Sequence, residues 1–177
     1  MALPARPEGL EPALGAMTLL AAAVVVHDRA AGRVLLLERG PAAKFGQGLW
    51  DLPTGKSEPG EPVTRTAVRE LWEETGLTVA PEDLSLAHVV HGPWGVEAPN
   101  GYLVVVFEAH RWRGEPCNRE PDKHAAVRWV STGELPGTMV PSSGAALRRC
   151  LAEGPGVWLA GRWSQPPAAG QDTPRPR

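Results

Sequence analysis

Three glutamates and an arginine stand close together between Arg69 and Glu74. Within a helix, which turns ~100° per residue, Glu70, Glu73 and Glu74 fall on one strip about 100° wide. Carboxylates this close repel one another and raise one another's pKa unless a cation compensates their charge. Magnesium takes oxygen ligands and commonly binds through a few carboxylates together with substrate phosphates. The cluster therefore predicts a divalent-metal site.

The acidic strip borders the side of the helix that is expected to pack against the core. Val63, Ala67 and Leu71 form the adjoining apolar face, so Glu70 and Glu74 lie at the edge of the buried side. The alternative is an ordinary solvated acidic face, but such a face would lie opposite the apolar residues. The placement argues against this alternative, and the full pattern of residues around the helix favours a functional site.

These glutamates belong to a longer pattern that begins at a glycine. It reads Gly55, five residues, Glu61, seven residues, Arg69-Glu70-Leu71, one residue, Glu73-Glu74, one residue, Gly76-Leu77. At roughly 7% per named residue, such a register arises by chance on the order of once in several million chains. The pattern resembles the Nudix box, and the chain is similar to the MutT-like branch of the Nudix hydrolases. Thr54 departs from the family pattern, because a second glycine commonly stands directly before the one that opens the box. A threonine has access to fewer backbone conformations than a glycine, so it restricts the geometry of that loop.

The resemblance implies a loop, helix and loop that bind one or more divalent ions, Mg²⁺ with Mn²⁺ as an alternative. The implied ligands are the carbonyl of Gly55 and the carboxylates of Glu70, Glu73 and Glu74. It also implies an ion pair between Arg69 and Glu61 that braces the helix, whereas pairing of Arg69 with Glu73 is the alternative. The implied general base is a box glutamate, Glu70 first, or an acid from a distant loop, Glu120.

Candidates for substrate contact lie outside the helix. Trp50 leads directly into the box, where similar proteins bring the substrate alongside, although a tryptophan also fills a core well. Glu120 and Lys123 precede a predicted strand at 125–130, and similar proteins place an acidic loop near the metals at this point. A plain loop acid is the alternative interpretation of Glu120.

Other aromatic and imidazole side chains are interpreted as structural. Trp72 and Trp129 are predicted to be core residues. The five histidines show no ligand spacing for zinc and are interpreted as structural or surface residues. The stretch Val140-Pro141-Ser142-Ser143 offers rotatable hydroxyls rather than the fixed bidentate pattern that reads an oxidised guanine.

The reaction implied by the resemblance is hydrolysis of a phosphoanhydride bond by a metal-activated water. The substrate would be a nucleoside triphosphate or a nucleoside diphosphate derivative; ADP-ribose or another such sugar is the alternative, with Pro93 as a weak indication. A binding module without catalysis is disfavoured because all three glutamates are present. The formal net charge of −2 disfavours an RNA-decapping role, duplex nucleic acid and anionic membranes, so small nucleotides are the expected partners. The sequence leaves open whether the protein forms a homodimer.

The fold implied by the resemblance is an α/β/α sandwich around a mixed β-sheet, and the predicted elements allow it. Strands are predicted at 18–27, 33–38, 84–90, 102–109 and 125–130, and helices at 62–75 and 142–152. The glycine- and proline-rich stretch 39–61 is predicted to be a long loop.

The length of 177 residues suits one domain. We expect the Nudix domain at 17–163, a flexible arm at 1–16 and a disordered, proline-rich tail at 164–177. The apolar run 19–26 is too short to span a bilayer, and two distant cysteines without CxxC spacing suit a reducing compartment. A cytoplasmic protein is therefore expected.

Overall fold

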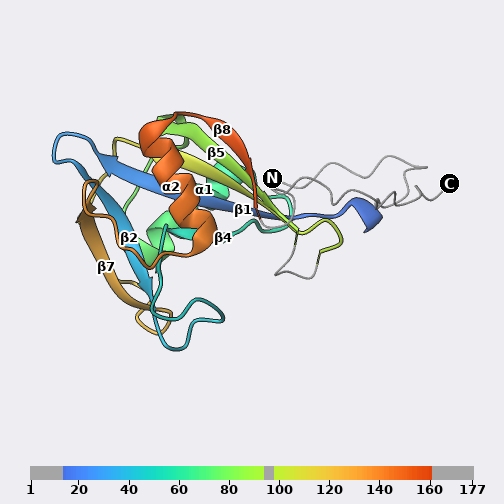
Figure 1. Cartoon of the computed structure of the whole chain (residues 1–177), viewed down its shortest axis with the longest axis horizontal. Coiled ribbons are helices and arrows are strands. Elements are labelled where there is room, and N and C mark those ends of the chain that lie inside the picture. Colours follow the sequence, from blue (N-terminus) through green and yellow to red (C-terminus); the bar gives the residue numbers. More distant parts are fainter. Residues whose placement is uncertain (1–13, 94–97, 161–177) are drawn as a thin grey trace.

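The computed structural model describes residues 14–93 and 98–160. It is an α/β/α sandwich in which two helices cover the two faces of a mixed sheet (Figure 1). The helices are α1 (Val63–Thr75) and α2 (Pro141–Ala152), and short 3₁₀ turns occur at Leu14–Ala16 and Pro81–Asp83. The strands are β1 (Leu19–Asp28), β2 (Arg33–Arg39), β3 (Trp50–Asp51), β4 (Thr54–Lys56), β5 (Leu84–Gly92), β6 (Tyr102–Ala109), β7 (His124–Ser131) and β8 (Gly156–Leu159).

The strands follow the order β3-β2-β1-β6-β5-β8, with β4 paired to β1 and β7 paired to β2. The sheet is mixed because β1 runs parallel to β6, from Leu19 opposite Tyr102 to Val26 opposite Ala109, and β5 runs parallel to β8. The remaining ladders are antiparallel. The fold predicted from the resemblance is confirmed.

Strand β1 lies at the centre of both cores, which explains its continuous apolar run. Its residues from Ala21 to Val26 are all buried. Successive side chains of a strand point to opposite faces. Ala22, Val24 and Val26 accordingly join the core beneath α1, whereas Ala23 and Val25 join the core beneath α2. A strand buried on both faces reads as an unbroken hydrophobic run.

Helix α1 begins and ends where the sequence signals place it. Pro62 is predicted to be the first residue of the helix. In the structure it is extended (φ −62°, ψ 137°) and is the N-cap residue, so the helix itself begins at Val63. At the other end Gly76 adopts φ 75° and donates its N–H to the carbonyl of Trp72 at 2.9 Å. The predicted helix is confirmed, with its start moved by one residue.

The prediction of one long loop at 39–61 was wrong in part. Two short strands, β3 and β4, interrupt this stretch and pair with β2 and β1. Strand β8 was not predicted at all. It is four residues long, begins with a glycine and leaves Val157 73% exposed at the edge of the sheet, so it lacks the buried alternating pattern by which strands are predicted.

The prediction that Trp72 is a core residue was also wrong. Its side chain is 46% exposed, and the guanidinium of Arg119 lies over its ring, 4.1 Å from the centroid. Such a cation–π contact lets an indole stay at the surface. Trp129 is half-buried against the core beneath α1, with Trp112 5.2 Å away between ring centroids.

The predicted arm and tail lie mostly outside the described residues. Of the arm, only Leu14–Ala16 is described, as a 3₁₀ turn, and the whole tail from 164 onward falls beyond residue 160. Neither helix within 14–93 and 98–160 has the length and apolar character needed to cross a membrane.

Candidate active site

The loop at the start of the box is held against the acidic face of α1. Strand β4 pairs with β1 so that Gly55 lies opposite Ala22. A Cβ added at Gly55 would lie 1.8 Å from the carboxyl carbon of Glu70. Only glycine leaves room for this approach, which explains the first position of the box and fixes the Glu70 carboxylate against the loop backbone.

Arg69 links the helix to the loop and to its neighbouring acids. Its Nε and Nη2 donate to the two oxygens of Glu61, both at 2.9 Å, which is a bidentate pair. Nη1 donates to Glu70 at 2.7 Å and to Glu73 at 3.0 Å, and Nη2 also reaches the carbonyl of Lys56 at 3.0 Å. Arg69 therefore pairs with Glu61 and with Glu73 at once, so the two alternatives weighed from the sequence coexist.

Glu61 is the anchor of this network on the loop side. Besides Arg69, its carboxylate accepts the hydroxyl of Thr66 at 2.8 Å and the backbone N–H of Glu58 at 3.1 Å. Donation from Arg69 is the main reason that the pKa of Glu61 falls to about 2. A carboxylate this acidic remains charged and holds the arginine in place.

Glu74 is a buried carboxylate at the end of the acidic strip, with only 6% of the residue exposed. One oxygen accepts the backbone N–H of Thr54 at 2.9 Å, and the other lies 3.2 Å from Nε2 of His124. Burial raises the pKa of Glu74 to about 7, against the lowering effect of His124 and Thr54, and Glu70 raises it further. The Glu74 carboxylate thus has two hydrogen-bonding partners, but burial still disfavours its charged form.

His124 is a residue of this cluster that the sequence analysis missed. It is buried, and its Nε2 faces Glu74 and, at 3.7 Å, Glu120. Its Nδ1 is buried without a hydrogen-bond partner among the described residues. The available signal was its position, four residues after Glu120 and directly before the strand at 125–130. Zinc spacing was the wrong criterion, because the partners of His124 lie on other elements.

The loop that carries Glu120 is fixed to the end of α1. Arg119 N–H donates to the carbonyl of Glu74 at 3.2 Å, and the Asn118 amide donates to the carbonyl of His124 at 2.7 Å. Lys123 pairs with Glu120 at 2.6 Å while 66% of its side chain is exposed. The loop therefore brings a partly buried carboxylate and an exposed cation beside the acidic strip.

The acids of this region carry more negative charge than their protein partners compensate. Burial is the first cause that raises the pKa of Glu70, and nearby Glu73 and Glu120 add to it. Ligand atoms of Glu74, Glu120 and His124 lie within 4.8 Å of one another. Buried carboxylates that destabilise one another are what a bound divalent cation would relieve, since hard cations prefer carboxylate oxygens.

Trp50, the remaining candidate, lies on another side of the loop. Its backbone N–H donates to the carbonyl of Thr138 at 3.0 Å, and its half-buried ring packs against the core beneath α2. Next to it the buried Asp51 pairs with Arg39 at 3.0 Å and accepts the hydroxyl of Ser143. These contacts join β3 to the start of α2.

An open hollow of about 400 Å³ borders the start of the box rather than the buried Glu74. Its lining is Met17, Thr18, Leu19, Leu20, Ser57, Glu58, Pro59, Gly60, Glu61 and Ala98. Glu61 belongs to this lining and also pairs with Arg69, which donates to Glu70 and Glu73, so the hollow borders the network that holds the acidic strip.

Comparison with known proteins agrees with this arrangement. The model of the NUDIX domain family matches residues 17–150. Phosphatase NudJ of Escherichia coli K12 is 31% identical over 113 residues, covering 64% of this chain and 68% of NudJ, and NudJ of Shigella flexneri matches equally well.

Solved structures give the same result. A MutT NUDIX hydrolase from Burkholderia pseudomallei superposes with a TM-score of 0.64 at 31% identity, covering 75% of this chain and 97% of that one. A NUDIX hydrolase from Nitrosomonas europaea, with a TM-score of 0.64 at 19% identity over 81% of this chain and 80% of its own, shows the shared fold alone. The chain belongs to the Nudix family and is a hydrolase of that family, acting on phosphoanhydrides.

Proposed function

We propose that this enzyme is a Mg²⁺-dependent pyrophosphohydrolase of nucleoside triphosphates or nucleoside diphosphate derivatives, with Mn²⁺ as an alternative ion. The observation that carries the proposal is the strip of mutually destabilised carboxylates on α1, with Glu74 buried and its pKa raised to about 7. An acidic strip that is costly without a cation is suited to bind one together with substrate phosphates.

The residues that would hold the ion are Glu70, Glu73 and Glu74, with the carbonyl of Gly55. Glu74 fits this role because Thr54 and His124 fix its orientation, as groups around a metal ligand commonly do. When bound, Mg²⁺ would neutralise charge on the phosphate oxygens and make a coordinated water more acidic. Glu120 is close enough to these ligands that its charge raises the pKa of Glu70. We therefore include Glu120 in the proposed site.

Glu70 is the proposed general base. Its carboxylate lies against Gly55 and accepts a hydrogen bond from Arg69, so its position is fixed from two sides. Arg69 and Glu61 act as positioning residues, because their bidentate pair ties α1 to the loop before it. Glu120 is the second candidate for the base; its pairing with Lys123 would have to rearrange for it to accept a proton.

The substrate contacts are proposed to come from three residues. Lys123 presents an exposed ammonium beside the acidic loop, where it can pair with a phosphate. Glu120 reaches the same place from that loop. Trp50 precedes the box directly, and its partly exposed indole is the proposed neighbour of the base or sugar.

A substrate screen tests this proposal. Nucleoside triphosphates and ADP-ribose would be incubated with Mg²⁺. Pyrophosphate and orthophosphate would be measured for the triphosphates, because the relative NudJ is named a phosphatase, and AMP would be measured for ADP-ribose. Magnesium-dependent cleavage of a member of either class is expected. Cleavage confined to ADP-ribose would assign the enzyme to nucleoside diphosphate sugars.

The contact between Gly55 and Glu70 leads to a prediction. In Gly55→Ala the new methyl group would displace the Glu70 carboxylate, the end of a flexible side chain, so the fold should persist. Turnover should fall at least ~10-fold, because moving a carboxylate away from the position that catalysis requires lowers the rate by at least this factor. Steady-state rates and thermal melts of both proteins measure this.

The matched control is Gly137→Ala, because a Cβ at Gly137 meets nothing within 4 Å. This variant should keep wild-type turnover. If Gly55→Ala kept it as well, the Glu70 carboxylate would not need its position against the loop.

A second prediction concerns oxidised guanine nucleotides. Ser143, at the start of α2, donates its hydroxyl to the buried Asp51 and is therefore committed within the protein. We expect kcat/KM for 8-oxo-dGTP to exceed that for dGTP by less than about tenfold, or ~1.4 kcal/mol. Parallel kinetics on the two nucleotides would measure it. A thousandfold preference would instead restore a role in clearing oxidised nucleotides.

A further inference from the structure

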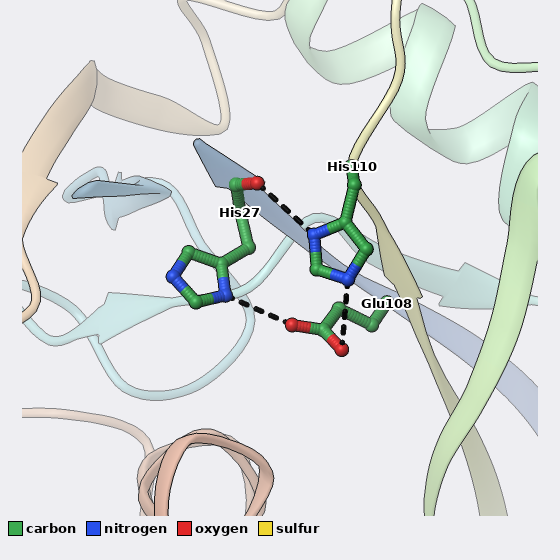
Figure 2. Close-up of side chains that lie close together, drawn as sticks. All are labelled: His27, Glu108 and His110. Atoms are coloured by element: carbon green, nitrogen blue, oxygen red, sulfur yellow. Dashed lines mark hydrogen bonds and ion pairs between the residues drawn. The ribbon is translucent and has the colours of Figure 1, made fainter. Parts of the chain in front are cut away.

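A second group of ionisable side chains lies where β1 and β6 end (Figure 2). His27 is the next-to-last residue of β1, Glu108 is the next-to-last residue of β6, and His110 follows that strand. The parallel register pairs Val25 with Glu108, so residues 27, 108 and 110 share one face of the sheet. Pairing of the two strands brings together residues that lie more than 80 positions apart.

Both imidazole rings turn toward the same carboxylate (Figure 2). Nδ1 of His27 lies 2.8 Å from one oxygen of Glu108, and Nε2 of His110 lies 3.2 Å from the other. The three ligand atoms all lie within 4.8 Å of one another. Side-chain exposure is 14% for His27, 13% for Glu108 and 32% for His110, so the group is sheltered but reachable from the His110 side.

The hydrogen bond on the far side of the His110 ring fixes which nitrogen can bind a cation. Nδ1 of His110 lies 3.3 Å from the carbonyl oxygen of His27, and a carbonyl only accepts. The proton of a neutral ring therefore sits on Nδ1, and the lone pair of Nε2 faces the Glu108 carboxylate. Two acceptors at 3.2 Å repel unless a proton or a metal cation lies between them. Metal-binding histidines are commonly held in this way, with the other ring N–H bonded to a backbone carbonyl.

The group is separate from the acidic strip. Gly55, which touches Glu70, pairs with Ala22, and His27 lies five residues further along β1, roughly 17 Å at a rise of ~3.3 Å per residue. His27 also shares the face of Ala23 and Val25, which pack beneath α2 rather than α1. No residue of the group belongs to the proposed hydrolytic machinery.

We propose that His27, Glu108 and His110 form a binding site for a borderline first-row divalent cation, with Zn²⁺ as its representative. Two imidazoles and one carboxylate are ligands of this class of ion, and Mg²⁺ prefers oxygen ligands alone. Three protein ligands leave a coordination position open for water or an added ligand. From the sequence alone these histidines are interpreted as structural or surface residues, because His27 stands 81 residues before Glu108.

Arg29 is the neighbouring positive charge that this site must tolerate. Its Nη2 lies 3.3 Å from the Glu108 oxygen that also faces His110. With 65% of its side chain exposed, Arg29 can turn into solvent when a metal binds. Replacing it with glutamine should therefore strengthen zinc binding.

Zinc titration of the full chain without a histidine tag tests the site. Mg²⁺ is kept at millimolar concentration so that it occupies the carboxylates of the acidic strip. A chromogenic chelator reports the concentration of free Zn²⁺. One tightly held ion per chain is expected. His110→Gln or Glu108→Gln should weaken it by more than about 100-fold, since loss of a ligand should exceed the ~10–100-fold cost of an outer-shell change.

Two control variants separate this site from others. His91→Gln removes an imidazole from β5 and should leave zinc affinity unchanged, because His91 pairs with Leu103 near the start of β6, whereas Glu108 lies near its end. Glu73→Gln, which is expected to disable hydrolysis, should also leave it unchanged, so failure of the proposed function and failure of the zinc site are distinguishable. Zinc affinity that falls in Glu73→Gln but not in Glu108→Gln would overturn the site.

X-ray absorption of the zinc-loaded wild type gives a result that does not depend on folded variants. A first shell of nitrogen and oxygen at ~2.0–2.2 Å, with two imidazoles, is expected. A sulfur shell at ~2.3 Å would assign the ion to a cysteine and overturn the proposal. A wild type without saturable zinc binding would overturn it too.

Discussion

Replacing Glu73 or Glu74 with glutamine should leave the fold intact and lower turnover by more than about 100-fold, given that even outer-shell changes around a metal cost ~10–100-fold. Glutamine keeps the shape of each side chain but removes the negative charge that a divalent cation needs. Glu73 gives the cleaner test, because 40% of its side chain is exposed and its loss should hardly disturb packing. Steady-state kinetics with Mg²⁺ and a thermal melt measure both effects.

Glu82→Gln is the matched control for these variants. Glu82 is an exposed acid in the 3₁₀ turn Pro81–Asp83, away from the acidic strip, so its neutralisation should change neither turnover nor melting temperature. Near wild-type turnover in Glu73→Gln or Glu74→Gln would contradict the assignment of these carboxylates to the metal.

Excess EDTA should abolish the activity of the wild-type enzyme, and added Mg²⁺ should restore it. Carboxylates that are buried and mutually repelling cannot by themselves stabilise the charge that develops on phosphate oxygens. Initial rates in buffer, in EDTA and after readdition of Mg²⁺ measure the effect. Mn²⁺ is expected to substitute.

EDTA that has first been saturated with Mg²⁺ is the control, and it should leave the rate unchanged. This separates removal of the ion from any direct effect of the chelator on the protein. Activity that persists in free EDTA would show that hydrolysis proceeds without the ion, and the proposed role of the acidic strip would then be wrong.

The sequence was most informative where structure depends on neighbours along the chain. Helix α1 could be predicted because Pro62 and Gly76 mark its ends and apolar side chains recur at helical spacing. The convergence of Glu70, Glu73 and Glu74 followed from the turn per residue alone. Strand β1 was recognisable because burial on both faces requires an unbroken apolar run.

Contacts between distant segments could not be predicted in the same way. His124 meets Glu74 across 50 residues, and only the pairing of β7 with β2 and the docking of the loop against α1 bring them together. Trp72 was misplaced for a similar reason. Its partner Arg119 comes from that same loop, and without this contact a tryptophan beside an apolar helical face reads as a core residue.

The two histidines beside Glu108 show the same limit. His27 and His110 are far apart in the chain, and Glu108, two residues before His110, does not by itself indicate a metal site. The parallel pairing of the two strands sets both beside Glu108. Spacing rules for metal sites apply to ligands on one element and do not detect this arrangement.

The most direct test of the central claim is product analysis by ³¹P NMR after incubation of nucleoside triphosphates and ADP-ribose with wild-type protein and Mg²⁺. The account predicts cleavage of a phosphoanhydride bond in at least one of these substrates, with product formation more than about 100-fold slower in parallel reactions of Glu73→Gln. Failure of the wild type to cleave any of them, or equal product formation by Glu73→Gln, would contradict it.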